Sequence, residues 1–120
     1  IRDLTVTGVQ TCALPISDSP MAPLEPLTLV SAAVNRVTIN GNLTGENERV
    51  SLEAGLRAIT IDAAWVMGWE DKIGSIRAGK NADFTILEAD PYRVAPKRIK
   101  DIKIWGTVFE GTPAPLLKDQ

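Results

Sequence analysis

One carboxylate in a proline-rich stretch is the residue of this chain with the most potential for chemistry. Asp18 stands in Ser17-Asp18-Ser19-Pro20, shortly before Pro23 and Pro26. A carboxylate can bind a hard or borderline metal cation and can accept a proton from an activated water molecule. In an Asp-Ser-Pro sequence, however, an aspartate usually forms an Asx turn or caps a loop. The residues alone therefore favour a structural role for Asp18.

A second polar stretch is Gly74-Ser75-Ile76-Arg77-Ala78-Gly79-Lys80-Asn81-Ala82-Asp83-Phe84-Thr85-Ile86-Leu87. Ile73 and Ile76 flank a short apolar piece, Gly79 can adopt a positive φ in a polar turn, and the apolar residues resume at Phe84. This pattern predicts a β-hairpin. We expect Lys80 and Asp83 to have structural roles, and we assign them no chemistry.

Composition excludes several classes of site. The chain has no histidine, and its one cysteine is Cys12, so neither a disulfide framework nor a Cys/His zinc site can form within it. A formal net charge of -2 argues against a nucleic acid partner. No apolar run approaches the roughly 20 residues of a membrane span. We expect a soluble, cytoplasmic protein with no membrane contact.

The hydrophobic periodicity predicts two helices before the motif. The first begins near Pro26, a residue suited to the first helical position, and continues to about Asn35 with one apolar face. The second and longest is capped by Ser51 and ends near Gly68. Its predicted apolar stripe consists of Leu52, Leu56, Ile59, Ala63 and Val66.

After the motif, a basic segment is followed by a segment with the pattern of a strand. Pro91–Lys100 carries Arg93, Lys97, Arg98 and Lys100, which we interpret as a solvated loop rather than an anion-binding patch. Residues 102–109 alternate in the manner of a half-buried strand, and residues 111–115 are expected to turn the chain back.

Taken together, these segments resemble the C-terminal part of the amidohydrolase superfamily, specifically its amidohydrolase family 3 branch, which includes N-substituted formamide deformylases. The Gly-Ser-Ile, Gly-Lys and Ala-Asp spacing of residues 74–87 is similar to a signature near the end of these enzymes. Residues 17–27 resemble the loop after the eighth barrel strand. The resemblance covers most of residues 17–111.

The resemblance implies a fold, a reaction and a role for Asp18. By it, Asp18 corresponds to the strand-8 aspartate that contacts the metal and takes a proton from the attacking water. It implies a parent enzyme that hydrolyses a non-peptide carbon–nitrogen bond of a small amide-type substrate, with a divalent metal, zinc being expected. A single carboxylate cannot hold a metal that needs about three protein ligands, so we expect this chain alone to bind no metal and to be inert.

Residues 1–16 have a different origin in this interpretation. They resemble the translated reverse complement of a common short-read sequencing adapter, and such segments are excluded from fold reasoning. The remaining 104 residues (120 minus 16) can form a modest core but not a complete (β/α)₈ barrel, which needs about 250 residues.

We therefore predict an α/β chain, the C-terminal fragment of a metal-dependent hydrolase. Residues 17–70 would be the end of a TIM barrel, with the strand-8 loop and closing helices. Residues 71–115 would be C-terminal strands of a partial β-sandwich, which in such enzymes also takes strands from the N-terminus, and residues 116–120 a tail. Two alternatives stay open: a small non-catalytic α+β module, and a fragment of another amidohydrolase branch, such as one like D-aminoacylase, dihydroorotase or imidazolonepropionase.

Overall fold

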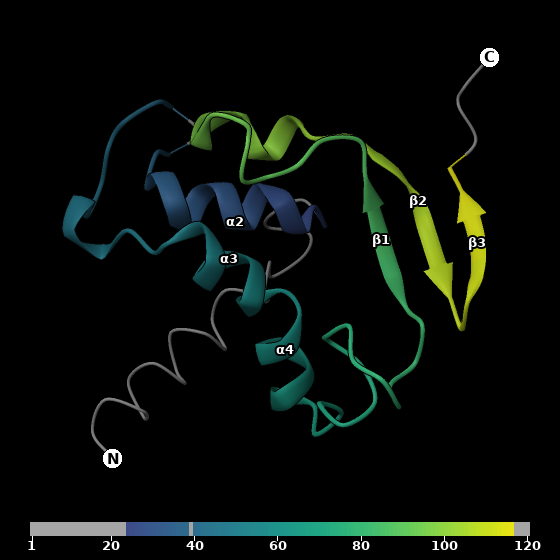
Figure 1. Ribbon diagram of the computed structural model, residues 1–120. Coiled ribbons are helices and arrows are strands. Elements are labelled where there is room, and N and C mark those ends of the chain that lie inside the picture. Colours follow the sequence, from purple (N-terminus) through teal and green to yellow (C-terminus); the bar gives the residue numbers. More distant parts are fainter. Residues whose placement is uncertain (1–23, 39, 117–120) are drawn as a thin grey trace.

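The computed structural model describes residues 24–38 and 40–116. Residues 1–16, Asp18 and all but the first residue of the predicted tail lie outside this part of the chain. The elements are helix α2 (Pro26–Asn35), the 3₁₀ helix η1 (Glu46–Glu48), helices α3 (Leu52–Ala58) and α4 (Ile61–Val66), strand β1 (Phe84–Leu87), the 3₁₀ helix η2 (Pro96–Asp101), and strands β2 (Ile104–Phe109) and β3 (Thr112–Pro115). The helices lie to one side and the three strands to the other (Figure 1). The predicted mixture of helix and strand is confirmed.

Helix α2 has the bounds that the periodicity predicted. Pro26 occupies its first turn, where a missing N–H costs nothing because that group has no partner within the helix. Val30 and Ala33 are 1% and 7% exposed, so they form the buried face. The helix ends at Arg36, whose φ is 53° and whose N–H donates to Ala32 O at 2.8 Å.

The predicted long helix is in fact two short ones, so that expectation was wrong. Ser51 caps α3 as predicted, accepting a hydrogen bond from the Ala54 N–H at 3.1 Å. The helical path breaks at Thr60, where φ and ψ are -126° and -99°. The Thr60 hydroxyl donates to Leu56 O at 2.8 Å, and a side chain that bonds back to the preceding turn competes with the helical pattern. After α4, Gly68 has a φ of 69° and ends the helical segment as expected.

The buried face of this helical pair also differs from the predicted stripe. The fully buried positions are small residues, Gly55, Ala58 and Ala64, whereas Val66 is 50% exposed. A Cβ atom at Gly55 would lie 3.0 Å from Val30 Cγ1, so the glycine allows α3 to approach α2 closely. Small size, rather than hydrophobicity, selects the residues at this helix contact.

The hairpin predicted around Gly79 does not form. Gly79 has the expected positive φ of 89°, but no residue from 73 to 76 is in a strand, and Ile76 is 83% exposed. Strand β1 instead pairs with β2, some twenty residues later, with Phe84 opposite Val108. The apolar pattern found the strand but not its partner, because pairing is a long-range property.

The sheet is antiparallel in the order β1-β2-β3. Its register shifts by one between Ile86 and Leu87, which marks a β-bulge around Trp105 and Gly106. Strands β2 and β3 are joined at Glu110 and Gly111, whose φ values of 47° and 81° are typical of a two-residue type I′ turn. The chain thus reverses near residue 111 as predicted, but residues 112–115, predicted as part of the turn, form strand β3. Strand β2 begins at Ile104 rather than at 102.

The core lies between α2 and η2. Of the side chains that the structure describes, Val30 and Ile99 are the largest fully buried ones, each 1% exposed, and Ile102 is 8% exposed. The interpretation of residues 96–101 as part of a solvated loop is wrong for Ile99, because this side chain is buried in η2, which packs on α2. Among the residues that the structure describes, no helix is long and apolar enough to cross a membrane.

Candidate functional site

The predicted catalytic residue, Asp18, precedes the first described residue by six positions. The nearest part of the chain that the structure describes is the start of α2. There the Glu25 carboxylate accepts a hydrogen bond from the Thr28 hydroxyl at 2.9 Å, and Glu25 O accepts from the Thr28 N–H at 2.9 Å. These bonds hold the entry to α2 in one conformation. They do not involve Asp18, whose role stays a prediction.

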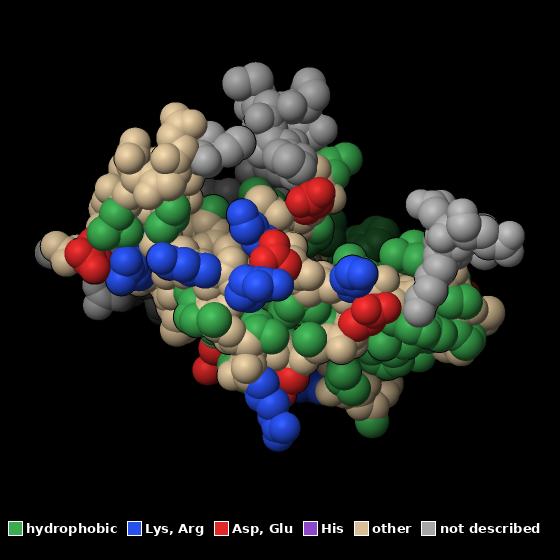
Figure 2. Space-filling view, turned by 90° about the horizontal axis from the view of Figure 1, so that it is seen from above, with side chains coloured by type: hydrophobic (Ala, Val, Ile, Leu, Met, Phe, Trp, Pro, Cys, Tyr) green, Lys and Arg blue, Asp and Glu red, His purple; other side chains and the backbone are tan. Residues whose placement is uncertain are grey.

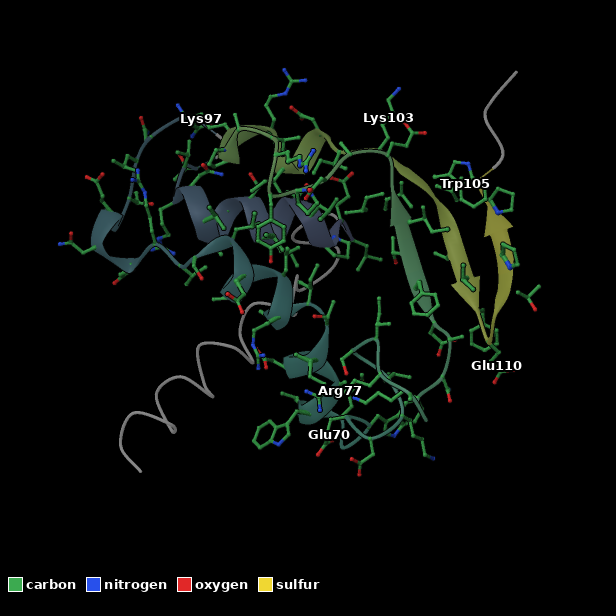
Figure 3. The ribbon with its side chains drawn as sticks, viewed as in Figure 1. Glu70, Arg77, Lys97, Lys103, Trp105 and Glu110 are labelled. Atoms are coloured by element: carbon green, nitrogen blue, oxygen red, sulfur yellow. The ribbon has the colours of Figure 1, made fainter. Side chains whose placement is uncertain are left out.

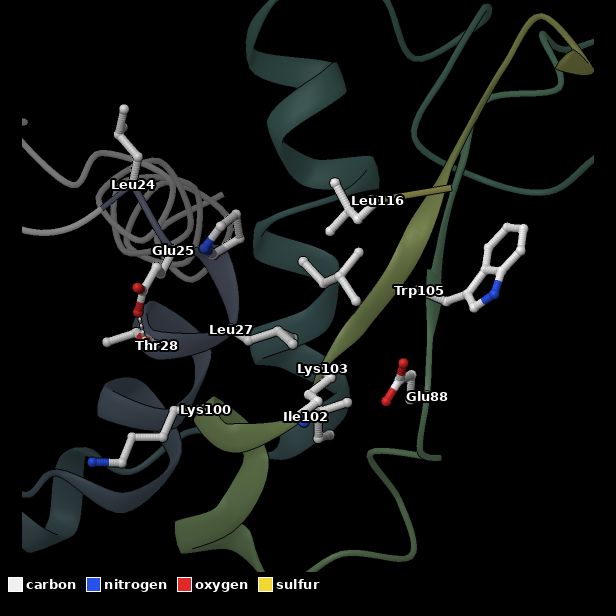
Figure 4. A pocket seen from close by; sticks show the side chains of 12 residues that line it. Leu24, Glu25, Leu27, Thr28, Glu88, Lys100, Ile102, Lys103, Trp105 and Leu116 are labelled. Carbon is white, nitrogen blue, oxygen red and sulfur yellow. Dashed lines mark hydrogen bonds between the residues drawn. The ribbon is translucent and has the colours of Figure 1, made fainter. Parts of the chain in front are cut away.

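A hollow of about 710 Å³ lies beside the start of α2 (Figure 4). Apolar side chains from the helix, from the end of η2 and from β2 contribute to its wall, among them Leu27, Ile102 and Ile104. Its charged members are Glu25, Glu88, Lys100 and Lys103. The sequence held no signal for this grouping, because the helix and strand residues are more than sixty positions apart.

The described residues do not fit a catalytic metal. Nowhere in residues 24–38 and 40–116 do three histidine, cysteine, aspartate or glutamate side chains gather closely enough to hold a metal ion. The chain has no histidine at all, which removes the commonest nitrogen ligand. The hollow beside α2 therefore lacks the donor set for metal chemistry within the described part of the chain.

Lys80 closes the loop between α4 and β1. Its ammonium group donates hydrogen bonds to Glu70 O, to Ser75 Oγ at 2.7 Å and to Ile73 O at 3.3 Å. An ammonium group has three donors, and here each one finds an oxygen of the same loop. The structural role expected for Lys80 is confirmed.

Asp83 ties this loop to the sheet. Its carboxylate accepts a hydrogen bond from the Glu110 N–H at 2.7 Å, and Ala82 O accepts from the Gly111 N–H at 2.9 Å. Both bonds reach the tight turn between β2 and β3, which lies at the lower tip of the sheet in Figure 3. The Ala-Asp pair of the motif thus connects two segments nearly thirty residues apart, as a structural role requires.

The basic residues around η2 do not form a single-sign surface. Arg98 Nε lies 2.7 Å from Asp101 Oδ2, and Arg93 Nε lies 3.4 Å from Asp90 Oδ2. Figure 2 shows basic and acidic side chains interspersed over the face seen from above, and Lys97 and Lys103 point outward in Figure 3. This arrangement agrees with solvated side chains and does not favour an anion-binding patch.

One carboxylate went unnoticed in the sequence. Glu70 Oε2 is buried and has no hydrogen-bond partner among the described residues. Glu70 lies in the lower part of the molecule in Figure 3, in the segment between α4 and β1. The sequence places this glutamate among other acidic and basic residues, and nothing in that pattern distinguishes it from a solvent-exposed side chain.

Comparisons with known proteins identify relatives along nearly the whole chain. A family model described as "Amidohydrolase family" matches residues 1–115. The matched span includes residues 1–16, whose adapter-derived origin stays a prediction.

Two curated bacterial relatives match most of the chain. YtcJ of Bacillus subtilis, named as an amidohydrolase, is 32% identical over 98 residues, which are 79% of this chain and 18% of that protein. N-substituted formamide deformylase of Arthrobacter pascens is 30% identical over 111 residues, which are 92% of this chain and 20% of that protein. The chain thus spans about a fifth of the length of these relatives.

A third relative matches a shorter part. Imidazolonepropionase of Bacteroides thetaiotaomicron is 40% identical over 48 residues, which are 40% of this chain and 12% of that protein. Among solved structures, an amidohydrolase from Thermotoga maritima MSB8 superposes with a TM-score of 0.58 at 23% identity, covering 80% of this chain and 21% of that one. At this identity, the likeness concerns the fold alone.

Proposed function

The chain belongs to the amidohydrolase family, and from this premise we propose that it is the C-terminal part of an enzyme that hydrolyses a carbon–nitrogen bond outside ordinary peptides. The observation that carries the proposal is the match to N-substituted formamide deformylase, which extends over 92% of this chain. The substrate would be a small amide-type molecule. Because the chain spans 20% of that relative, most of the catalytic machinery would lie in other parts of the parent protein.

The branch within the family follows from the extent of the matches. The deformylase match covers 111 residues of the chain, whereas the imidazolonepropionase match covers 48. The match to imidazolonepropionase therefore leaves more than half of the chain without a counterpart. We infer the family 3 branch, and the comparisons do not favour a small non-catalytic module.

In the parent we assign residues 17–70 to the end of a TIM barrel and residues 71–115 to a β-sandwich. The two outer edges of the described sheet indicate where further strands of such a sandwich could pair. Leu116 N donates to Trp105 O at 2.9 Å, so by alternation along the strand Pro113 and Pro115 have their nitrogen atoms on the outer edge. Proline has no N–H, so this edge offers few donors to a further strand.

The opposite edge of the sheet retains its donors. Glu88 N donates to Lys103 O at 2.8 Å, so alternation places the N–H groups of Thr85 and Leu87 on the outer side of β1. Within the described residues, no hydrogen bond of the sheet uses this side. We propose that strands from the rest of the parent add to the sheet across β1, which would complete a sandwich that is only partly present here.

Asp18 is the residue that we propose for the reaction itself. Its carboxylate would accept a proton from the water that attacks the substrate, a role that suits an unprotonated acid. Amidohydrolases generally use a divalent metal, and we expect zinc in the parent. Since the described residues supply no metal-binding group, its ligands, apart from Asp18, would come from other parts of the parent protein.

Recovery of the source DNA upstream of the Ser17 codon tests the proposal first. A reading frame of barrel length with a His-x-His pair near its start is the expected result. A start codon directly before Ser17, or genomic codons for residues 1–16, would contradict the fragment assignment and remove the argument for Asp18.

The recovered enzyme then allows a direct test of Asp18. Asp18→Asn should reduce turnover of N-substituted formamides by roughly 10²- to 10⁴-fold, the usual contribution of a general base, with little change in stability. Asp83→Asn is the matched control, because Asp83 contacts the sheet turn and has no proposed chemistry. Equal turnover in the two variants would refute the catalytic assignment.

A further inference from the structure

The loop after α2 contains an exposed Asn-Gly pair. Asn40 is followed directly by Gly41, and both residues are exposed. Gly41 has a φ of +81°, and no atom lies within 4 Å of the position that a Cβ would occupy. We propose that Asn40 is a modification site, at which the chain converts the side-chain amide into a succinimide and then into aspartate or isoaspartate.

The reaction uses groups of the chain and water. The backbone nitrogen of Gly41 attacks Cγ of Asn40 and forms a new N–C bond. The bond from Cγ to Nδ2 breaks, and the side-chain nitrogen leaves as ammonia together with the proton that Gly41 N has lost. Water then opens the five-membered ring at either carbonyl, giving aspartate or isoaspartate. No oxidant, reductant or cofactor is required.

The absence of a side chain on the following residue is what distinguishes Asn40. The chain has five asparagines, and Asn40 is the one that glycine follows; the others precede arginine, leucine, glutamate and alanine. A side chain on the following residue crowds the attacking nitrogen, whereas Gly41 leaves it open on the side where a Cβ would stand. The sequence and the geometry therefore indicate the same site.

Asn35 illustrates the opposite case. Its amide nitrogen donates to Ser31 O at 2.8 Å and to Pro96 O at 2.9 Å, so the side chain is held away from the backbone nitrogen of Arg36. Rotation toward that nitrogen would break both bonds. Asn35 should therefore keep its amide for as long as α2 and η2 stay packed.

The native turn slows the reaction at Asn40 without preventing it. The Gly41 N–H donates to Thr38 O at 2.9 Å, and this bond must open before the nitrogen can attack. The turn is stabilised further by the Asn42 N–H, which donates to the Thr38 hydroxyl at 3.1 Å. Because an exposed turn opens more easily than a packed helix, the rate should rise when the chain is unfolded, but it should be measurable in the folded state.

The product changes the charge and the backbone of this loop. Either product adds one negative charge, which takes the formal net charge from -2 to -3. Isoaspartate also inserts a methylene group into the main chain within the turn. That insertion should weaken the isolated bridge between Val37 and Leu43, which closes the loop.

The test is incubation of the full 120-residue chain in mildly alkaline buffer, followed by peptide mapping and enzymatic detection of isoaspartate. The expected result is an amide-to-acid mass shift at Asn40 before any other asparagine, with release of ammonia and faster conversion in urea. Asn40→Gln should abolish the isoaspartate signal while retaining Gly41. Gly41→Ala should slow it while retaining Asn40.

Two results would overturn the proposal. One is conversion at another asparagine before Asn40 in the folded chain. The other is an intact Asn40 in the folded chain after a time in which the urea-unfolded chain has converted completely at that position. That second result would mean that the hydrogen bond from Gly41 N to Thr38 O protects Asn40 from conversion in the folded chain.

Discussion

The substitution Gly74→Ala separates the two reasons for which the motif contains glycine. Gly74 and Gly79 have nearly the same positive φ, 83° and 89°. Their surroundings differ, because a Cβ at Gly74 would lie 2.7 Å from Ala64 Cβ and 2.9 Å from Ile61 Cα, whereas nothing lies within 4 Å at Gly79. The pair therefore shares the conformational cost and differs in crowding.

The expected free energies follow from these two terms. Placing an alanine in the left-handed region costs about 1–2 kcal/mol, so Gly79→Ala should lower the free energy of unfolding by that amount. At Gly74 the added methyl group also meets α4, including backbone that cannot rotate away, and overpacking of this kind costs about 1–3 kcal/mol more. Gly74→Ala should therefore cost about 2–5 kcal/mol in total.

Urea denaturation followed by tryptophan fluorescence measures both variants against the unsubstituted chain. An unchanged slope with a lower midpoint would indicate a change in stability alone. If Gly79→Ala proved as destabilising as Gly74→Ala, the close packing of Gly74 against α4 could not be the reason for that glycine.

Further predictions concern the structural residues of the motif and the expected absence of metal. Lys80→Met should lower the free energy of unfolding by about 2–3 kcal/mol, because it removes charge-assisted hydrogen bonds to loop oxygens. As the control, Lys97→Met replaces a lysine that points to solvent and should change the free energy of unfolding by less than about 0.5 kcal/mol. Equal urea midpoints for the two variants would contradict this expectation. Asp83→Ala should cost about 1–2 kcal/mol by leaving the Glu110 N–H without its acceptor, and an unchanged thermal midpoint would show that the bond contributes nothing. The purified chain should retain no stoichiometric zinc after dialysis, and one tightly held zinc with amidase turnover would refute the assignment of the metal ligands to other parts of the parent. Deletion of residues 1–16 should leave the melting temperature unchanged, and a large decrease would show that this segment contributes to the fold.

Local signals were sufficient wherever the deciding interactions are local. The start of α2 at Pro26, the cap at Ser51 and the stop at Gly68 each depend on groups within one helical turn, and all three were predicted. The interruption at Thr60 was missed, because an apolar stripe continues through it and the bond from its hydroxyl to Leu56 O is one of several that threonine can make.

The candidate site was predicted from resemblance more than from physics. Asp18 was selected because its surroundings resemble a family loop, since an aspartate before Ser-Pro has an adequate structural explanation by itself. The roles of Lys80 and Asp83 were predicted only as structural, without partners. Their partners come from a loop carbonyl ten residues earlier and from a turn twenty-seven residues later.

The sequence by itself determined the family, the position of α2, the strand character of β1 and β2, and the positive φ of Gly79, because these depend on neighbouring residues and on literal motif spacing. The tertiary structure decided which strand pairs with β1, that Ile99 is buried in η2 where it packs on α2, and that α3 meets the valines of α2 with small residues rather than with large apolar ones. These features depend on distances between segments far apart in the chain. No local pattern of side chains encodes such distances, since they are set only when the elements pack together.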